Sequence, residues 1–363
     1  MNSAEEPEEP ASADGGKRQL LRIWLPLLAL SILLVIVMQL VALPASLLLG
    51  PMLASILIVF SGRRITMPRL PFNLAQGVLG CLIARTMTWP VLQEIAADWM
   101  IFVAGVLSVV FASIAIGWVL ARYQVLPGTT AIWGAFPGAA SVMTLMSASF
   151  GADMRLVAFM QYTRVVIVTL VAATFARFYT GGAAETAVPV YWFAEPQWGP
   201  LAQTLALILV GVFFGRWLKL PAGPMLATVI AGSVLNVTGL IEIELPQILL
   251  AIAYATLGWG IGARFDRAVI VDAGRAMPRV IASIIALVAI CGLLAALLVW
   301  LTGIDPLSAY LATSPGGADS IAIISASTDV DVAFVMSMQI ARFFFVMALG
   351  PILAKLVAKH SRF

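Results

Sequence analysis

Long apolar runs separated by short polar connections extend along almost the whole chain. Most of these runs approach about 20 residues, the length that an α-helix needs to cross a lipid bilayer. The pattern predicts an all-α polytopic membrane protein. The expected spans are 23–41, 47–60, 72–92, 99–121 and 155–178 in the first half, and 199–217, 225–240, 246–261, 280–301 and 333–357 in the second.

Composition supports the same class. Hydrophobic residues make up 61% of the 363 positions and charged residues 11%, and the mean hydropathy is +1.01. One soluble core of this length could not hide so much apolar surface. Lys and Arg lie mostly at the ends of apolar runs, which indicates membrane boundaries rather than a nucleic-acid surface. With one histidine, and with two cysteines that lie in apolar runs, we expect no metal site and no disulfide framework. We also expect no cofactor, and we do not expect the chain to be an enzyme.

One stretch of sequence occurs twice, 178 residues apart. The first copy covers residues 137–164 (PGAASVMTLMSASFGADMRLVAFMQYTR), and the second covers residues 315–342 (PGGADSIAIISASTDVDVAFVMSMQIAR). Both contain Pro-Gly, Ser-Ala-Ser, Asp, Met-Gln and a final Arg at matching positions. Gly-Pro-Met (50–52 and 223–225) and Leu-Gly (79–80 and 257–258) are repeated as well. The chain is therefore an internal duplication.

The Pro-Gly pair divides an apolar segment in each half. Pro137 and Gly138 split residues 128–150 into two pieces that would reach only about 15 to 18 Å as helices, close to the bilayer midplane. Residues 307–328 have the same organisation. Irregular backbone at that depth is tolerated only inside protein or beside a wet cavity. The sequence predicts two half-helices per segment, joined as a re-entrant hairpin.

Two topologies are compatible with a broken segment. If it crosses the membrane, each half has six spans and the halves are parallel; if it is re-entrant, each half has five spans and the halves are inverted. The re-entrant reading places nearly all the basic connections on the inside and the acidic ones on the outside, as the positive-inside rule requires. It divides the chain into a disordered tail with a basic flank (1–22), a first repeat (23–180), a periplasmic linker (181–197) and a second repeat (198–357).

The repeated Gln and Arg residues are the first candidates for a functional site. Arg164 and Arg342 would lie about 16 Å into a span. A charged side chain at this depth costs free energy and usually has a functional role. Gln161 and Gln339 precede them by three residues and share their helix face. The alternative roles are a structural ion pair or carbonyl clamp for the arginines, and helix–helix hydrogen bonding for the glutamines.

The hairpin tips are the second candidates. Small residues there allow a ligand to approach the backbone closely, and helix N-termini favour an anion. Close packing of the helices would also explain why these residues are small. The predicted substrate-binding residues are Gly138, Ala139, Ser141, Gln161, Arg164, Gly316, Gly317, Ser320, Gln339 and Arg342.

Three carboxylates are candidates for coupling to a proton or cation. Asp319 lies at the second tip and has Ser141 as its counterpart in the first half. Asp153 and Asp331 lie where a helix is expected to begin, so helix capping is their alternative role. The pair Arg85 and Arg264 lies near span ends, where interface anchoring is the simpler role.

The motif PGxA…SASxxxD…MQxxR in both halves, with GPM near the start of each, resembles the AbrB duplication family of Gram-negative inner-membrane proteins. The resemblance covers the chain after its N-terminal tail and implies an inverted-repeat architecture loosely related to cation/proton antiporters. Family members carry labels such as regulator of gene expression or ammonia monooxygenase. The sequence contains neither a helix-turn-helix nor a metal-ligand cluster that would support those labels.

These features predict an inner-membrane secondary transporter with a cytoplasmic N-terminus. Its site would lie at the midplane between the two hairpins and would take a small anionic or polar solute, with proton or cation coupling. A membrane-embedded sensor that affects gene expression through a partner is the alternative, and a membrane enzyme ranks third. The expected partners are the lipid bilayer, a small-molecule solute and, as one option, a second copy of the chain, with no nucleic acid.

Overall fold

The computed structural model describes residues 13–360 except 42, 44, 64, 127, 180–191, 193–194, 219–221, 266, 318–320, 323, 326–327 and 329. Within these residues the regular elements are all helices. They are α1 (Ala13–Leu40), α2 (Ser46–Phe60), α3 (Arg69–Ala84), α4 (Trp89–Ala97), α5 (Trp99–Arg122), α6 (Gly128–Ala135), α7 (Ala140–Ser149), α8 (Met154–Tyr179), α9 (Trp198–Trp217), α10 (Gly223–Val237), α11 (Gln247–Gly262), α12 (Arg267–Thr302), α13 (Pro306–Thr313) and α15 (Val332–His360).

The duplication extends to the helix boundaries. The helices α3, α4, α6 and α8 begin at residues 69, 89, 128 and 154, and α11, α12, α13 and α15 begin 178 positions later at 247, 267, 306 and 332. The single helix α12 thus takes the place of both α4 and α5. Because the offset is constant for these helices, equivalent positions in the two halves can be compared directly.

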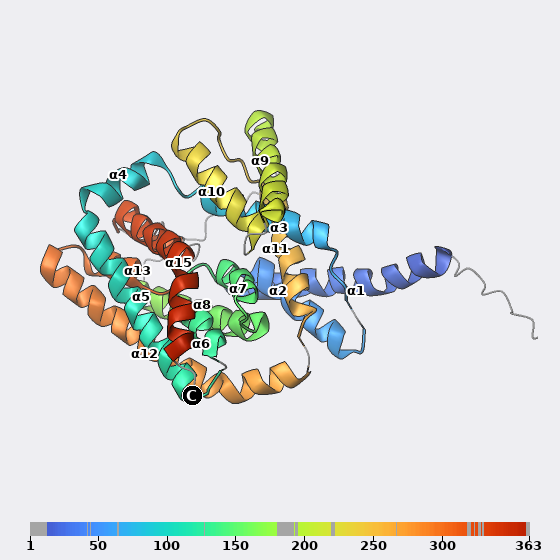
Figure 1. Cartoon of the computed structure of the whole chain (residues 1–363), viewed down its shortest axis with the longest axis horizontal. Coiled ribbons are helices and arrows are strands. Elements are labelled where there is room, and N and C mark those ends of the chain that lie inside the picture. The colour runs from blue at the N-terminus through green and yellow to red at the C-terminus, as the bar shows by residue number, and fades with distance from the viewer. Residues whose placement is uncertain are drawn as a thin grey trace, which may run out of the picture.

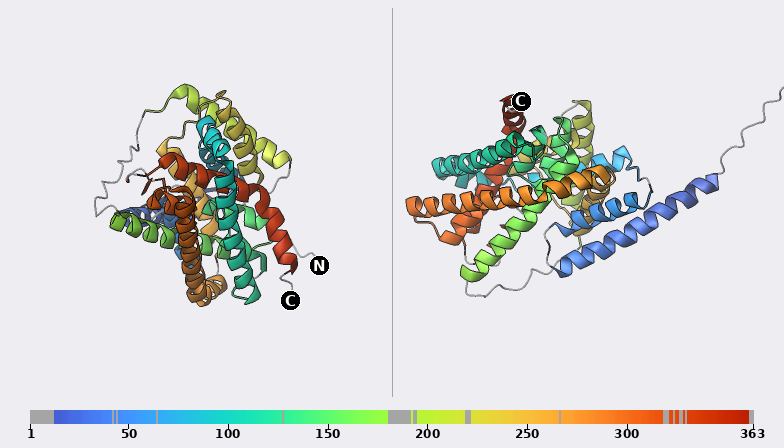
Figure 2. Two further views of the ribbon diagram at one scale, coloured as in Figure 1. Left: turned by 90° about the vertical axis from the view of Figure 1, so that its left-hand side faces the viewer. Right: turned by 90° about the horizontal axis from the view of Figure 1, so that it is seen from below.

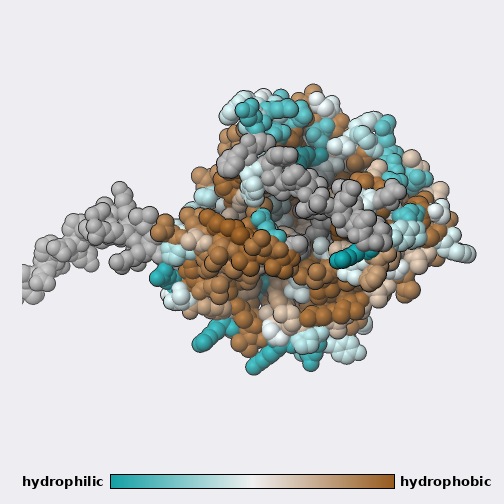
Figure 3. Space-filling view, turned by 180° about the vertical axis from the view of Figure 1, so that it is seen from behind, coloured by the Kyte–Doolittle hydropathy of each residue, from teal (hydrophilic) through white to brown (hydrophobic). Residues whose placement is uncertain are grey.

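Among the described residues, six helices are long and apolar enough to cross a membrane: Ile23–Leu40, Trp99–Arg122, Met154–Tyr179, Trp198–Trp217, Val269–Thr302 and Val332–Gly350. Shorter apolar helices, among them α2, α10 and α11, pack between them. On the face in Figure 3, hydrophobic residues form a broad area with hydrophilic residues toward its upper and lower edges. The fold is that of a polytopic membrane protein.

The helices form two bundles. We call α1, α2, α3, α9, α10 and α11 the short-helix bundle, and α4–α8, α12, α13 and α15 the hairpin bundle. Figure 1 shows α1, α2 and α11 on one side of the molecule and α4, α5 and α12 on the other, and Figure 2 shows α1 leading outward at the edge. The helix α8 packs on α11 where the bundles meet.

The repeated Gly-Pro-Met and Leu-Gly motifs pack on each other across the two halves. A Cβ added at Gly258 in α11 would lie 2.6 Å from the carbonyl oxygen of Leu48 and 3.0 Å from the amide nitrogen of Met52 in α2. A Cβ at the equivalent Gly80 in α3 would lie 2.8 Å from the carbonyl oxygen of Met225 in α10. Each Leu-Gly pair therefore packs against the Gly-Pro-Met helix of the opposite half. Only glycine, which has no Cβ, allows the two backbones to approach this closely.

Several helix boundaries differ from the sequence prediction. The expected span 72–92 is broken between α3 and α4, because Pro90 can occupy the first turn of a helix but not its interior. Residues 267–279, expected to be a basic loop, form the first turns of α12. Arg and Ala are good helix formers, so a charge cluster at the membrane boundary does not end the helix. The helix α1 begins at Ala13, within the expected tail.

The cross-packed glycines give the first prediction. Gly258→Ala and Gly80→Ala should each lower the free energy of unfolding by about 1 to 3 kcal/mol, because the new methyl group overpacks a backbone contact. Gly292→Ala in α12 is the matched control, since a Cβ there meets no atom within 4 Å. Thermal unfolding in detergent measures the difference. Equal melting temperatures for Gly258→Ala and Gly292→Ala would contradict the close approach.

Candidate functional site

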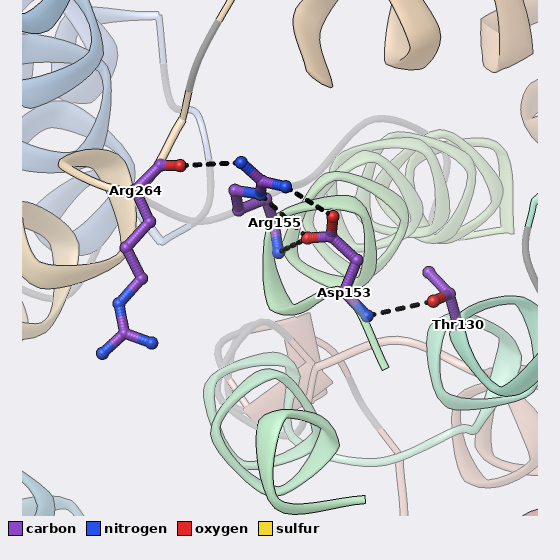
Figure 4. A network of polar contacts seen from close by, with 4 residues as sticks. All are labelled: Thr130, Asp153, Arg155 and Arg264. Carbon is purple, nitrogen blue, oxygen red and sulfur yellow. Dashed lines mark hydrogen bonds and ion pairs between the residues drawn. The ribbon is translucent and has the colours of Figure 1, made fainter. Parts of the chain in front are cut away.

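Each broken segment folds back so that its two ends meet. In the first half, the amide of Asp153 donates to Thr130 Oγ1 at 3.0 Å, which joins the start of α8 to the start of α6 (Figure 4). In the second half, the amide of Asp331 donates to Ser308 Oγ at 3.0 Å. Thr130 and Ser308 are themselves 178 residues apart. The expected hairpin geometry is therefore present at the ends of both segments.

In the first half, Gln161 and Arg164 bind the carbonyl oxygens at the end of α6. Gln161 Nε2 donates to Trp133 O at 2.8 Å and to Phe136 O at 3.1 Å. Arg164 Nη1 donates to Phe136 O at 2.7 Å and to Ala135 O at 3.2 Å, and its Nη2 donates to Gln161 Oε1 at 2.5 Å. The two side chains act as one clamp on the hairpin tip.

The second half repeats this clamp at the end of α13. Gln339 Nε2 donates to Leu311 O at 2.7 Å and to Ser314 O at 3.3 Å. Arg342 Nη1 donates to Thr313 O at 3.4 Å, and its Nη2 donates to Gln339 Oε1. The carbonyl-clamp geometry raised for the arginines as an alternative is thus the one that both halves adopt.

The need for such a clamp follows from the break. The last four carbonyl groups of a helix have no partner within it, and an unsatisfied carbonyl in the bilayer core costs several kcal/mol. Pro137 and Pro315 follow α6 and α13 and stop these two helices inside the hydrophobic part of the fold. A guanidinium group there satisfies several carbonyl oxygens at once, and its charge interacts favourably with the C-terminal end of the helix dipole.

The clamps leave buried positive charge. Arg164 is 1% exposed and Arg342 is 2% exposed. Among the described residues, no carboxylate lies within ion-pair distance of either, and Arg164 Nε has no hydrogen-bond partner. Buried charge of this kind is usually paired with an opposite charge.

The two halves meet beside these arginines, where α5 crosses α12. Val109 packs there against Leu287 and Cys291. Val109 and Leu287 are equivalent positions, as are the buried Ser113 and Cys291. Thr313, whose carbonyl oxygen accepts from Arg342, donates its hydroxyl to Cys291 O at 3.3 Å, so this crossing lies beside the second clamp. This crossing of α5 and α12 was not predicted from the sequence, although the 178-residue spacing of its two residue pairs was a signal that could have identified it.

The tips carry the other predicted binding residues. Gly138, Gly316 and Ser141 are buried, whereas Ala139 and Gly317 are half-buried. The helix α7 begins after Ala139 without a side-chain cap, so its N-cap residue does not satisfy the first amides of the helix. Two further predicted residues, Asp319 and Ser320, lie outside the described residues.

The other two candidate carboxylates lie at helix starts, away from the tips. Asp331 Oδ1 accepts from the amide of Phe334 at 2.9 Å, which is a helix cap. Asp153 Oδ1 accepts from the amide of Arg155 at 2.9 Å, and its Oδ2 pairs with Arg155 Nη2 at 2.8 Å. The hydrogen bond from the Arg155 side chain lowers the pKa of Asp153, although burial acts in the opposite direction. Capping is thus the interaction that the structure describes for both.

The clamp generates a stability prediction. Gln161→Leu removes both bonds to the α6 carbonyls and the acceptor of Arg164, so it should lower the free energy of unfolding by about 2 to 4 kcal/mol. Gln247→Leu, at an exposed position at the start of α11, is the matched control and should change it little. Denaturant unfolding in detergent measures both. If Gln161→Leu were as stable as the control, the tip carbonyls would not depend on the clamp.

Comparisons with known proteins identify the family of the chain. The family model described as "Transition state regulatory protein AbrB" matches residues 47–358. A protein of Escherichia coli (strain K12) named "Putative regulator AbrB" is 43% identical over 339 residues, which are 93% of this chain and 97% of that protein. A protein of Bacillus subtilis (strain 168) named "Uncharacterized protein YhjN" is 26% identical over 295 residues, 77% of this chain and 76% of that protein. The chain belongs to the AbrB family.

Proposed function

We propose that the protein is an inner-membrane secondary transporter of a small anionic solute. The observation that carries the proposal is the pair Arg164 and Arg342, which are buried and have no carboxylate partner in the described part of the chain. A solute carboxylate or phosphate would supply the missing negative charge. The arginines are placed by their clamps, so the site is preorganised before the solute arrives.

The proposed binding surface combines the first hairpin tip with this positive charge. The uncapped amides at the start of α7 and the orphaned Nε of Arg164 are donors that no described side chain satisfies. A helix N-terminus at a broken segment is the usual anion site in transporters. The second tip would contribute Gly316 and Gly317 from the opposite side, next to Val168 and Val165 of α8.

We propose the inverted topology, with five spans and one re-entrant hairpin in each half and a cytoplasmic N-terminus. The joined ends of each broken segment support it. So does the neighbourhood of Arg264, which lines one pocket together with Ile65 and Arg69. In the six-span alternative, the loop at 61–69 and the residues around Arg264 would lie on opposite sides of the membrane.

The two bundles provide a basis for alternating access. Polar contacts that join them include Arg155 Nη1 to Arg264 O at 3.1 Å and the amide of Ala222 to Ser149 Oγ at 3.3 Å. Movement of one bundle past the other would break and remake such contacts. Asp319 is the proposed coupling carboxylate, on the sequence alone.

A regulatory role is the second candidate, because the Escherichia coli relative is named as a regulator. In that case the same pocket would report solute occupancy to a partner. The two functions differ in one respect that can be measured: a transporter moves solute across a liposome membrane without any other protein, and a sensor only binds it.

Cysteine accessibility tests the topology. Ser61→Cys and Arg267→Cys should react with a membrane-impermeant maleimide only from the cytoplasmic side, and Asp98→Cys and Glu242→Cys only from the periplasmic side, because the two loop sets are separated by the bilayer. All four positions are exposed, and the native Cys81 and Cys291 are buried. Labelling of Arg267→Cys from the periplasm would eliminate the inverted arrangement.

Solute binding tests the function. A panel of small carboxylates and phosphates should contain compounds that raise the melting temperature, since a ligand at about ten times its Kd stabilises the folded state by about 1.4 kcal/mol. Ala139→Leu should abolish the shift by covering the α7 amides while the clamp stays intact. Ala206→Leu, at an exposed position in α9, is the matched control and should keep it. Uptake of the same compound into proteoliposomes then separates transport from sensing. If no carboxylate or phosphate raised the melting temperature, the proposed anion site would be contradicted.

A further inference from the structure

A polar cavity of about 360 Å³ lies in the short-helix bundle, between the start of α3 and the end of α11. It is apart from the arginine clamps, which belong to the hairpin bundle. Its polar lining consists of Arg69, Asn73, Gln76 and Arg264, with Phe72 beside them, and none of the described lining side chains is acidic. The volume is at the lower end of the range for small-molecule sites, about 300 to 1,000 Å³.

The base of the cavity holds a buried polar group without a partner. Gln76 is only 7% exposed, lines the cavity, and its Oε1 has no hydrogen-bond partner. An unsatisfied buried polar group of this kind typically costs about 1 to 3 kcal/mol. A ligand that offered a hydroxyl donor to this oxygen would remove that cost.

The mouth of the cavity carries positive charge. Arg69 and Arg264 are both exposed, and the Arg264 guanidinium lies 5.8 Å from the centre of the Phe72 ring. Arg264 is fixed through its backbone, because its carbonyl oxygen accepts from Arg155 Nη1 at 3.1 Å. Figure 4 shows that the Arg264 side chain extends away from the Arg155–Asp153 pair, so its guanidinium group does not join that pair.

The duplication does not explain this site. The positions 178 residues after Asn73 and Gln76 are Ala251 and Tyr254, so the polar pair occurs in the first half only. The helices α3 and α11 occupy equivalent places in the two halves, and α11 packs without these amides. Packing of a helix at this place in the fold therefore does not require a buried glutamine.

We infer that this cavity binds a small oxyanion that also carries a hydroxyl group. The two guanidinium groups would bind the anionic oxygens, Asn73 would add a donor, and the hydroxyl would donate to Gln76 Oε1. Hydrogen phosphate is the simplest such anion. The glycerol phosphate headgroup of phosphatidylglycerol has the same chemistry, so the ligand can come from solution or from the bilayer.

Nanodiscs distinguish these two sources. In phosphatidylcholine nanodiscs, millimolar inorganic phosphate should raise the melting temperature if the ligand is soluble. If the ligand is a lipid, nanodiscs that contain phosphatidylglycerol should raise it and phosphate should not. Arg264→Gln should weaken either response about tenfold or more, because a lost charge-assisted contact is worth at least one decade in Kd. Arg275→Gln, an exposed residue in α12 that does not line the cavity, should leave it unchanged.

Gln76→Leu provides a second readout that does not depend on Arg264. It removes the unsatisfied oxygen, so the empty protein should melt at the same or a higher temperature while its affinity for the anion falls. The absence of any response to phosphate and phosphatidylglycerol, or an undiminished response in both Arg264→Gln and Gln76→Leu, would overturn the inference. Ala139→Leu should keep this response, so failure here and failure of the transport site are distinguishable.

Discussion

The backbone at the two hairpin tips must find hydrogen-bond partners where water is scarce, and the rest of the structure is arranged around this requirement. A proline ends each half-helix inside the hydrophobic part of the fold, which leaves carbonyl oxygens that another group must satisfy. A Gln and an Arg one turn apart, on α8 in the first half and on α15 in the second, supply the donors. The same solution occurs in both halves, at equivalent positions, with equivalent carbonyl oxygens.

This solution has an electrostatic consequence. Neutral donors would have satisfied the carbonyls without adding charge, but the arginines bring two positive charges into the buried centre where α5 crosses α12. A charge in such a place must be balanced, and the described residues do not balance it. The structural role and the proposed binding role would therefore be two effects of one arrangement: the clamp fixes the tips, and the charge that the described residues leave unpaired is the proposed attraction for an anion.

The second organising contact is the exchange of helices between halves. Gly80 and Gly258 allow α3 and α11 to lie directly on the Gly-Pro-Met helices of the opposite repeat. Neither repeat can build the short-helix bundle by itself, so this bundle ties the two halves together. The helices of the hairpin bundle pack mainly on one another. Polar links such as the bond from Arg155 to Arg264 connect the hairpin bundle to the short-helix bundle. A tightly interlocked bundle beside a bundle that holds the broken helices is an arrangement suited to relative movement.

The sequence by itself determined the membrane class, the duplication, the place of the break and the residues worth examining, because each depends on local properties: apolar run length, repeated letters, and the inability of proline to continue a helix. Only the tertiary structure decided what those residues contact. The sequence placed Arg164 and Gln161 on one face but could not show that their donors are used by α6 carbonyls. Nor could it show that Gln76 and Arg264, from different repeats, line one cavity, since helices far apart in the chain meet only through the packing of the whole fold.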